Sequence, residues 1–206
     1  MVSCMLDLET LSLRPDAAVI AIGAAIFDEQ KVLHSEGWSL DLATVNGHVD
    51  METLAWWLRQ SDEAREAAFG GMLTPFNAAF GLKTFLAQHN PQEYWANDPE
   101  FDFVILKQWW ARQNSLALAD SRQLHIGDYP LGGKTYLMSR SYRTIIAEAE
   151  RLGYDTQFFR GMYVAHNPVD DAVSQARAVI EARRCIGQAH DAGAIKVPTI
   201  GQRFQS

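Results

Sequence analysis

The stretch Met5-Leu6-Asp7-Leu8-Glu9-Thr10 alternates apolar side chains with two carboxylates, which is the pattern of a β-strand. Residues two apart on a strand share a face, so Asp7 and Glu9 point the same way while Leu6 and Leu8 point toward the opposite, packed face. Two like charges side by side at the end of an apolar strand are costly unless a cation, usually a divalent metal ion, lies between them. The alternative is a strand that runs into a solvated turn with two ordinary surface acids.

The bulk composition is typical of a globular protein. The chain has 206 residues, 48% of them hydrophobic and 21% charged, which predicts one domain with its own core. We expect this domain to span residues 1–187, followed by a C-terminal tail over 188–206. No run is apolar enough to span a membrane, and no secretory leader is visible at the N-terminus. Cys4 and Cys185 lie far apart without a Cys/His cluster, which favours two buried thiols in the reducing cytoplasm.

The charge balance restricts the kinds of partner. The net charge is −7, from 18 basic and 25 acidic residues, which argues against loose, nonspecific binding to nucleic acid. It does not exclude a nucleic-acid enzyme whose acidic residues gather around metal ions. Two bound divalent cations would add four positive charges and raise the total from −7 to −3.

Hydrophobic periodicity predicts three strands followed by alternating helices and strands. We expect strands at residues 2–8, 17–27, 32–40, 93–96 and 163–165, with the third antiparallel to the second. The predicted helices span residues 50–60, 75–90, 101–113, 141–152 and 168–186. Residues 116–135 are expected to form a long irregular loop. This order of elements indicates an α/β domain with a mixed sheet.

Two of the predicted helices begin with the same chemistry. Asp98-Pro99-Glu100-Phe101-Asp102 and Asn167-Pro168-Val169-Asp170-Asp171 each contain a capping residue, a proline, and an aspartate three residues after that proline. Acids favour helix starts in general, but this effect fades beyond the first turn and explains Asp102 and Asp171 less well. His166 lies five residues before Asp171. A lone histidine is more often structural than catalytic, but this place beside a helix start shifts the interpretation toward a functional role.

Taken together, these segments resemble the motifs of the DEDD superfamily of 3′–5′ exonucleases, in its DEDDh branch. The motifs are Asp7-Leu8-Glu9-Thr10, residues 95–102 and His166-Asn167-Pro168-Val169-Asp170-Asp171-Ala172. The resemblance covers about residues 5–183 and is strongest to phage DexA-type exonucleases and the related mycobacterial-type exoribonuclease family. Residues 50–59 and 140–144 also resemble segments of that group. Each motif is weak alone, but three in order at domain-sized separations are specific.

The resemblance implies a ribonuclease H-like fold, with a mixed central β-sheet flanked by helices, and two Mg²⁺ or Mn²⁺ ions per site. It also implies that Asp7, Glu9, Asp102 and Asp171 are metal ligands and that His166 is the general base. Hard oxygen ligands suit these ions, and a pair of ions can activate water and stabilise the leaving oxygen of a phosphodiester. Histidine can accept the proton of that water near neutral pH. The 116–135 loop departs from the family by its length, which leaves its role open.

The residues predicted to contact substrate lie close to these motifs in the sequence, and they are Thr10, Leu11, Trp57, Phe101 and Arg143. Leu11 is expected to wedge against the terminal base, with core packing as the alternative. Trp56 and Trp57 are adjacent and face different directions on a helix, so one is expected in the core while the other is free to stack on a base. Arg140 and Arg143 can contact phosphate, although exposed arginines at helix starts are often only solvated.

The sequence therefore predicts a metal-dependent 3′–5′ exonuclease. Its expected substrate is the 3′ end of single-stranded DNA, with release of nucleoside 5′-monophosphates. Trimming of RNA 3′ ends is the alternative, because the two substrates are told apart by contacts to the 2′-hydroxyl. A non-catalytic nucleic-acid-binding or polymerase-associated module is a different class, and it is less compatible with a complete set of ligands. The tail and the exposed aromatic residues permit a homodimer.

Overall fold

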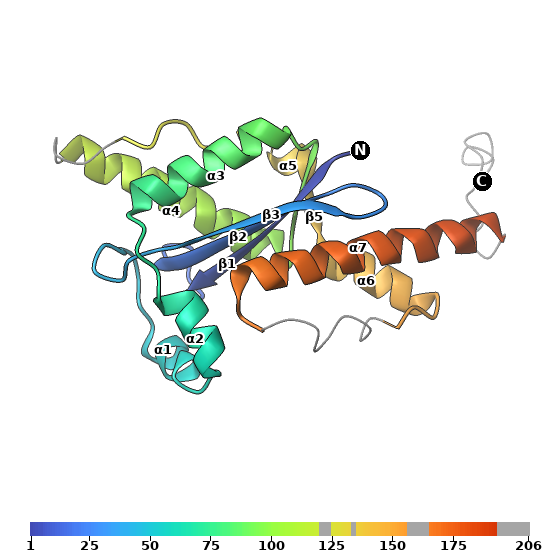
Figure 1. Cartoon of the computed structure of the whole chain (residues 1–206), viewed down its shortest axis with the longest axis horizontal. Helices are drawn as coiled ribbons and strands as arrows, with labels where there is room; N and C mark the ends of the chain where they lie inside the picture. Colours follow the sequence, from blue (N-terminus) through green and yellow to red (C-terminus); the bar gives the residue numbers. More distant parts are fainter. Residues whose placement is uncertain (120–124, 133–134, 156–164, 193–206) are drawn as a thin grey trace, which may run out of the picture.

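The computed structural model describes residues 1–119, 125–132, 135–155 and 165–192. In these ranges the chain forms a five-stranded mixed sheet with helices on both faces (Figure 1). The sheet has the order β3-β2-β1-β4-β5 and consists of β1 (Ser3–Thr10), β2 (Val19–Phe27), β3 (Val32–Ser39), β4 (Glu93–Ala96) and β5 (Ser139–Ser141). The helices are α1 (Met51–Trp57), α2 (Asp62–Phe69), α3 (Pro75–His89), α4 (Pro99–Ala119), α5 (Thr135–Met138), α6 (Tyr142–Arg151) and α7 (Pro168–Asp191). The predicted α/β class, with a mixed central sheet flanked by helices, is confirmed.

Strand β1 is the centre of this sheet. It pairs antiparallel with β2 and parallel with β4, while β3 adds to β2 antiparallel, as predicted, and β5 adds to β4 parallel. All eight residues of β1 and all nine of β2 are buried. Strands that are covered on both faces usually carry apolar side chains on both. The two buried carboxylates of β1 depart from this rule, and burying a charge is costly unless the charge is compensated.

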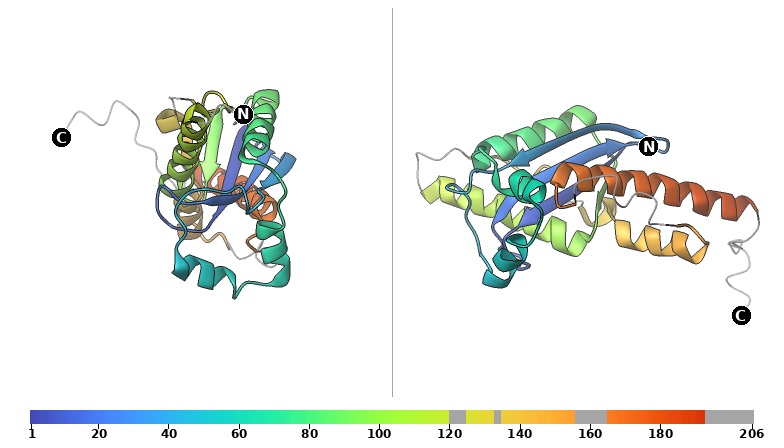
Figure 2. Two further views of the ribbon diagram at one scale, coloured as in Figure 1. Left: turned by 90° about the vertical axis from the view of Figure 1, so that its left-hand side faces the viewer. Right: turned by 60° about the horizontal axis from the view of Figure 1, so that its bottom comes forward.

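The two faces of β1 contact different helices. Cys4, Leu6 and Leu8 belong to the large core cluster that α3 and α4 cover, whereas Met5 packs with apolar residues of α7. Figures 1 and 2 show α3 and α4 on one side of the sheet and α6 and α7 on the other. Because side chains alternate along a strand, Asp7 and Glu9 share the face of Met5 and point toward α7. The opposite orientation of Leu6 and Leu8 is as predicted.

Several predicted boundaries change in the structure. The helix predicted over 50–60 ends at Trp57, and the chain then forms α2, which the sequence analysis did not predict. The signal for α2 was present, because Ser61 caps it by accepting a hydrogen bond from the amide of Ala64, and two acids follow directly. Helix α7 continues to Asp191, five residues beyond the predicted end at residue 186. Strand β5 was also not predicted.

The predicted irregular loop over 116–135 is partly helical. Helix α4 begins at Pro99, earlier than the predicted residue 101, and extends to Ala119, so the first four residues of the predicted loop are its last turn. Residues 120–124 and 133–134 of this loop lie outside the described residues, as do residues 163–164 of the predicted strand and 193–206 of the predicted tail. No helix in the described part of the chain is long and apolar enough to cross a membrane.

Candidate active site

Four carboxylates from three distant parts of the chain converge beside the end of β1. Asp7 and Glu9 come from the second half of β1, and each is only 8% exposed. Asp102 comes from the first turns of α4 and is 4% exposed, while Asp171 comes from the start of α7 and is half-buried. The structure therefore brings together the four acids that the sequence motifs single out.

The two helix starts are built as the sequence predicts. The side-chain oxygen of Asn167 accepts hydrogen bonds from the backbone amides of Val169 and Asp170, at 3.1 and 3.2 Å. The Asp98 carboxylate accepts one from the amide of Glu100 at 3.1 Å, and the Asp98 carbonyl accepts one from the amide of Asp102 at 2.9 Å. These caps fix where each helix begins, and they hold Asp102 and Asp171 one turn inside.

Two glycines let the start of α7 lie directly on the sheet. Gly23 pairs with Asp7 across β1 and β2, and Gly37 of β3 pairs with Gly23. A Cβ atom on Gly23 would lie 1.9 Å from the carbonyl oxygen of Pro168, and one on Gly37 would lie 2.3 Å from Cγ2 of Val169. This close approach sets the distance between α7 and the sheet, and it was not predicted from the sequence. Its signal was an isolated glycine in an apolar strand, which often marks a close backbone approach.

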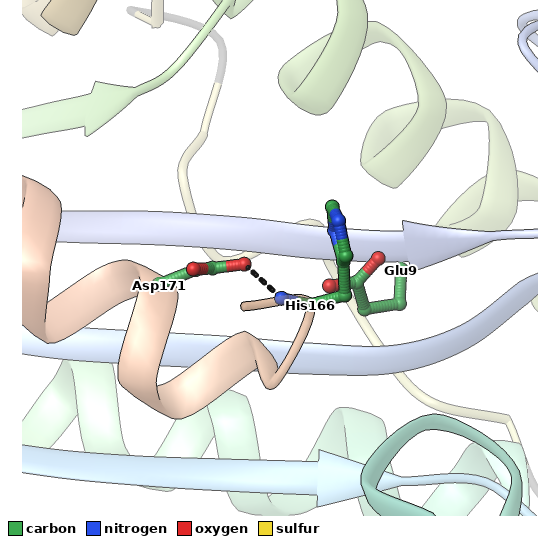
Figure 3. A group of neighbouring side chains, drawn as sticks. All are labelled: Glu9, His166 and Asp171. Carbon is green, nitrogen blue, oxygen red and sulfur yellow. Dashed lines mark hydrogen bonds between the residues drawn. The ribbon is translucent and has the colours of Figure 1, made fainter. Parts of the chain in front are cut away.

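His166 lies between the carboxylates and two tryptophans. Its backbone amide donates a hydrogen bond to Oδ2 of Asp171 at 2.9 Å, and its φ of +65° places it in the left-handed region just before α7. Its ring meets the rings of Trp56 and Trp57 edge to face, with centroids 4.7 and 6.0 Å away. Glu9, His166 and Asp171 each offer one ligand atom, all within 4.8 Å of one another, and Figure 3 shows Glu9 and Asp171 on either side of His166.

Burial raises the proton affinity of all four carboxylates, and repulsion within the cluster raises that of Asp7 and Glu9 further. Burial, followed by repulsion from Asp102 and Asp171, raises the pKa of Asp7 well above its usual range, although the Gln175 amide opposes this rise. Burial and repulsion from the other three acids do the same to the pKa of Glu9. Burial raises the pKa of Asp102 to about 7, against the lowering effect of backbone hydrogen bonds from Asp98 and Leu8. Burial also raises the pKa of Asp171. The cluster thus carries more negative charge than its surroundings compensate.

The donor set of the cluster suits a divalent metal ion. Among the described residues, no lysine or arginine forms an ion pair with Asp7, Glu9, Asp102 or Asp171. Carboxylate oxygens are hard ligands of the kind that Mg²⁺ and Mn²⁺ prefer. A cation held here would supply the positive charge that the surrounding protein does not.

A pocket of about 490 Å³ opens beside the carboxylates. Its size is in the usual range for small-molecule sites. It is lined by residues of the first motif, of α1 and the turn that follows it, and of α4, among them Glu9, Thr10, Trp56, Arg59 and Phe101. The predicted contacts Thr10 and Phe101 therefore face this pocket, although the Thr10 hydroxyl already donates to the carbonyl of Ser12 at 2.8 Å. Arg59 is a lining residue that the sequence analysis did not select.

Two of the predicted contacts turn out to be core residues. Leu11 is 6% exposed and packs with Ile20 and Trp57, so it has the core role that was the alternative for it. Trp57 is 1% exposed, and its indole nitrogen donates to the carbonyl of Thr10 at 2.9 Å. Trp56 is instead the partly exposed ring, at 37%. Both tryptophans line the pocket, but Trp57 is enclosed among core residues, so Trp56 rather than the predicted Trp57 is the ring left free to stack on a base.

The two predicted arginines occupy different surroundings. Arg143 is 66% exposed, donates to the side-chain oxygen of Asn97 at 3.3 Å and lies 3.7 Å from the Asp98 carboxylate, close to the start of α4. It is therefore near enough to the second motif to stay a candidate. Arg140 forms an ion pair with Glu93 at 3.1 Å and also donates hydrogen bonds to backbone carbonyls. Its guanidinium is therefore already bonded within the protein.

Similar folds occur among solved nucleases. The nuclease domain of 3′hExo, described as a DEDDh family member bound to rAMP, has a TM-score of 0.55 and 12% identity, over 96% of both chains. Exonuclease X in complex with 5′ overhanging duplex DNA has a TM-score of 0.48 and 12% identity, over 90% of this chain and 93% of that one. S. pombe Pop2p, in an Mg²⁺- and Mn²⁺-bound form, has a TM-score of 0.47 and 13% identity, over 88% and 82%. No curated protein matches the sequence. At this identity the likeness to 3′hExo establishes a shared fold.

The mixed sheet and its flanking helices have the ribonuclease H-like fold that the sequence predicts, shared with the 3′hExo nuclease domain. Residues 2–182 match the model of the 3′–5′ exoribonuclease Rv2179c-like domain, and the chain belongs to this family. It is a 3′–5′ exonuclease that acts on nucleic acid, as predicted. The fold that it shares with the 3′hExo nuclease domain, which is described as a DEDDh family member, is consistent with the predicted DEDDh branch.

Proposed function

We propose that this chain removes nucleotides one at a time from the 3′ end of single-stranded RNA and releases nucleoside 5′-monophosphates. The observation that carries this proposal is the position of Glu9, which belongs both to the carboxylate cluster and to the wall of the adjacent pocket. A terminal nucleotide in that pocket would present its phosphodiester to the cluster. The geometry therefore supports a site that binds a chain end and cleaves next to it.

Asp7, Glu9, Asp102 and Asp171 are the residues that would hold two Mg²⁺ or Mn²⁺ ions. When bound, such ions supply the positive charge that lowers the barrier to attack on a phosphodiester. The raised pKa values of Asp7 and Glu9 support this assignment, because groups that repel one another in the free protein gain most from a shared cation. The four carboxylates thus fit the ions by charge and by donor type.

His166 is the residue that would accept the proton of the attacking water. The new bond joins the water oxygen to phosphorus and the bond from phosphorus to the 3′ oxygen breaks. The shortened chain leaves with a 3′-hydroxyl once this oxygen has taken up a proton from solvent. Imidazole is suited to general-base work near neutral pH. The hydrogen bond from the His166 backbone to Asp171 and the contact with Trp56 restrict the position of the ring.

RNA is proposed as the preferred substrate because the family to which the chain belongs is described as an exoribonuclease family. The 3′hExo structure, which shares the fold, contains rAMP, a ribonucleotide. Single-stranded DNA, the substrate expected first from the sequence, stays a prediction. One assay distinguishes RNA from DNA as the preferred substrate. Discrimination between them would depend on contacts to the 2′-hydroxyl of the nucleotide in the pocket.

The test uses an RNA and a DNA oligonucleotide of the same sequence, each labelled at the 5′ end. Each is incubated with the full chain and Mg²⁺, Mn²⁺ or a chelator. We expect shortening from the 3′ end that requires metal, is faster on RNA and yields nucleoside 5′-monophosphates. Faster cleavage of DNA would replace the proposed substrate by DNA, and cleavage that persists in chelator would refute the metal-dependent mechanism.

Replacing His166 by alanine should remove most turnover and leave metal binding intact. General-base catalysis contributes about 10²–10⁴-fold, and we expect a loss of kcat in that range. The measurement is kcat on the preferred oligonucleotide, with Mn²⁺ affinity and melting temperature as checks. His125 is a suitable control, because its exposed side chain lies in the loop after α4. Full activity in His166→Ala would remove the base assignment.

Replacing Trp56 by alanine should weaken substrate binding more than it slows the chemical step. Stacking of a base on an aromatic ring is worth about 1–3 kcal/mol, so KM should rise by at least fivefold or so. Phe80→Ala is the matched control, because Phe80 is 62% exposed and lies on α3, away from the pocket lining. An unchanged KM in Trp56→Ala would show that the exposed ring does not contact the base.

A further inference from the structure

A glutamine on α7 contacts the carboxylate cluster. The side-chain amide nitrogen of Gln175 donates a hydrogen bond to Oδ1 of Asp7 at 2.9 Å, across 168 residues of sequence. Gln175 lies one helical turn after Asp171, so both side chains leave α7 on the same face. The start of α7 therefore brings two groups to the cluster, a carboxylate and an amide.

The surroundings of Gln175 make a purely structural role a poor explanation. The neighbouring positions on this part of α7 are the small apolar residues Ala172, Ala176 and Val179, which pack against the sheet. The other amide atom of Gln175, Oε1, is buried and has no hydrogen-bond partner among the described residues. Burying an amide in this way costs free energy that an apolar side chain would avoid. The bond to Asp7 is the contact that distinguishes glutamine from an apolar residue here.

We propose that Gln175 is a positioning residue for Asp7, whose amide fixes the orientation in which the carboxylate binds a divalent cation. The inference rests on the proposed metal site, and it concerns a residue outside the four carboxylates and the histidine. A hydrogen bond to one carboxylate oxygen restricts rotation of the Asp7 side chain. This side chain then loses less conformational entropy when a cation binds. Residues that orient metal ligands in this way affect metal affinity by about 10–100-fold when they are replaced.

The test replaces Gln175 by methionine, which keeps the chain length and helix propensity but cannot donate the hydrogen bond. Binding of Mn²⁺ alone to the full chain is measured by calorimetry or by the electron paramagnetic resonance signal of the free ion. We expect the Mn²⁺ dissociation constant of Gln175→Met to rise by about tenfold or more. The Mn²⁺ concentration for half-maximal cleavage should rise in parallel, and saturating Mn²⁺ should restore most of kcat.

Gln188→Met is the matched control, because Gln188 is an exposed glutamine near the other end of α7. Its Mn²⁺ affinity should equal that of the wild type. Equal affinity in Gln175→Met would overturn the positioning role while leaving the proposed function intact. A wild-type chain that binds no Mn²⁺ would instead refute the metal site itself.

If circular dichroism shows that Gln175→Met does not fold, Gln175→Asn takes its place, with the same expected loss of affinity. The asparagine keeps an amide that is one methylene shorter and does not reach Asp7 with the same geometry. Failure of both variants to fold would assign Gln175 to the stability of the domain and overturn the proposal.

Discussion

Asp7→Asn is expected to abolish nucleotide release and, in the metal-free protein, to raise the melting temperature. Asparagine keeps the shape of the side chain and an oxygen that can accept the hydrogen bond from Gln175. It removes a negative charge that is buried beside Asp102 and Asp171. Replacing even a residue that supports a metal ligand costs about 10–100-fold in activity or affinity, and loss of a proposed ligand should exceed a hundredfold or so.

The sign of the stability change follows from the raised pKa of Asp7. A carboxyl whose pKa is higher in the folded than in the unfolded state favours folding while it is protonated, and this contribution is lost as the pH rises. The metal-free wild type should therefore lose stability from about pH 4 upward, and Asp102, with a pKa of about 7, should extend this loss toward neutral pH. The asparagine side chain of the variant does not titrate, so the melting temperatures of variant and wild type should agree at low pH and separate above it.

Thermal melts in chelator from pH 4 to pH 8 measure this difference, and they need no nucleic acid. Asp191→Asn is the control, because its side chain is 87% exposed at the end of α7. It should leave both the turnover and the slope of melting temperature against pH unchanged. If Asp7→Asn melts below the wild type at pH 8 in chelator, mutual repulsion among the acids does not determine how this cluster affects stability. Wild-type turnover would refute the role of Asp7 as a metal ligand.

The parts of the site that follow from the sequence are those encoded locally. Alternation along β1 sets the direction of Asp7 and Glu9 because side chains on a strand have a period of two. The caps Asp98 and Asn167 set the helix register because each cap bonds to amides within its own first turn. In such cases a few neighbouring residues contain the whole physical cause, and the structure agrees with the prediction.

The parts that the sequence did not reveal depend on which segments meet. Trp56 and Trp57 have identical side chains in adjacent positions. Only the packing of α1 against apolar residues such as Leu11 and Ile20 decides that Trp57 is enclosed. Asp7, the partner of Gln175, is 168 residues away. The position of Gln175 one turn after Asp171 therefore does not by itself identify this contact. The need for glycine at position 23 becomes visible only when α7 is known to cross β2.

Gly23→Ala should impair both stability and turnover, although Gly23 carries no functional group. The added Cβ would lie 1.9 Å from the oxygen and 2.2 Å from the carbon of the Pro168 carbonyl, and 2.8 Å from the amide nitrogen of Val169. These are backbone atoms, so no side-chain rotation relieves the clash and the start of α7 has to move. Forcing extra volume into a packed core costs about 1–3 kcal/mol, which corresponds to about 2–4 °C of melting temperature per kcal/mol in a domain of this size.

The loss of turnover follows because Asp171 lies three residues after Pro168 and moves with it. A displacement of about 1 Å at a catalytic group can cost about a hundredfold in rate, and we expect kcat of Gly23→Ala to fall by that order. Gly37→Ala should have a smaller effect, because its Cβ would meet a side-chain methyl group of Val169 and not the backbone of α7. Gly187→Ala is the control, since nothing lies within 4 Å of its added Cβ and alanine favours the helix. Wild-type melting and turnover in Gly23→Ala would mean that the close approach of α7 to β2 does not set the position of Asp171.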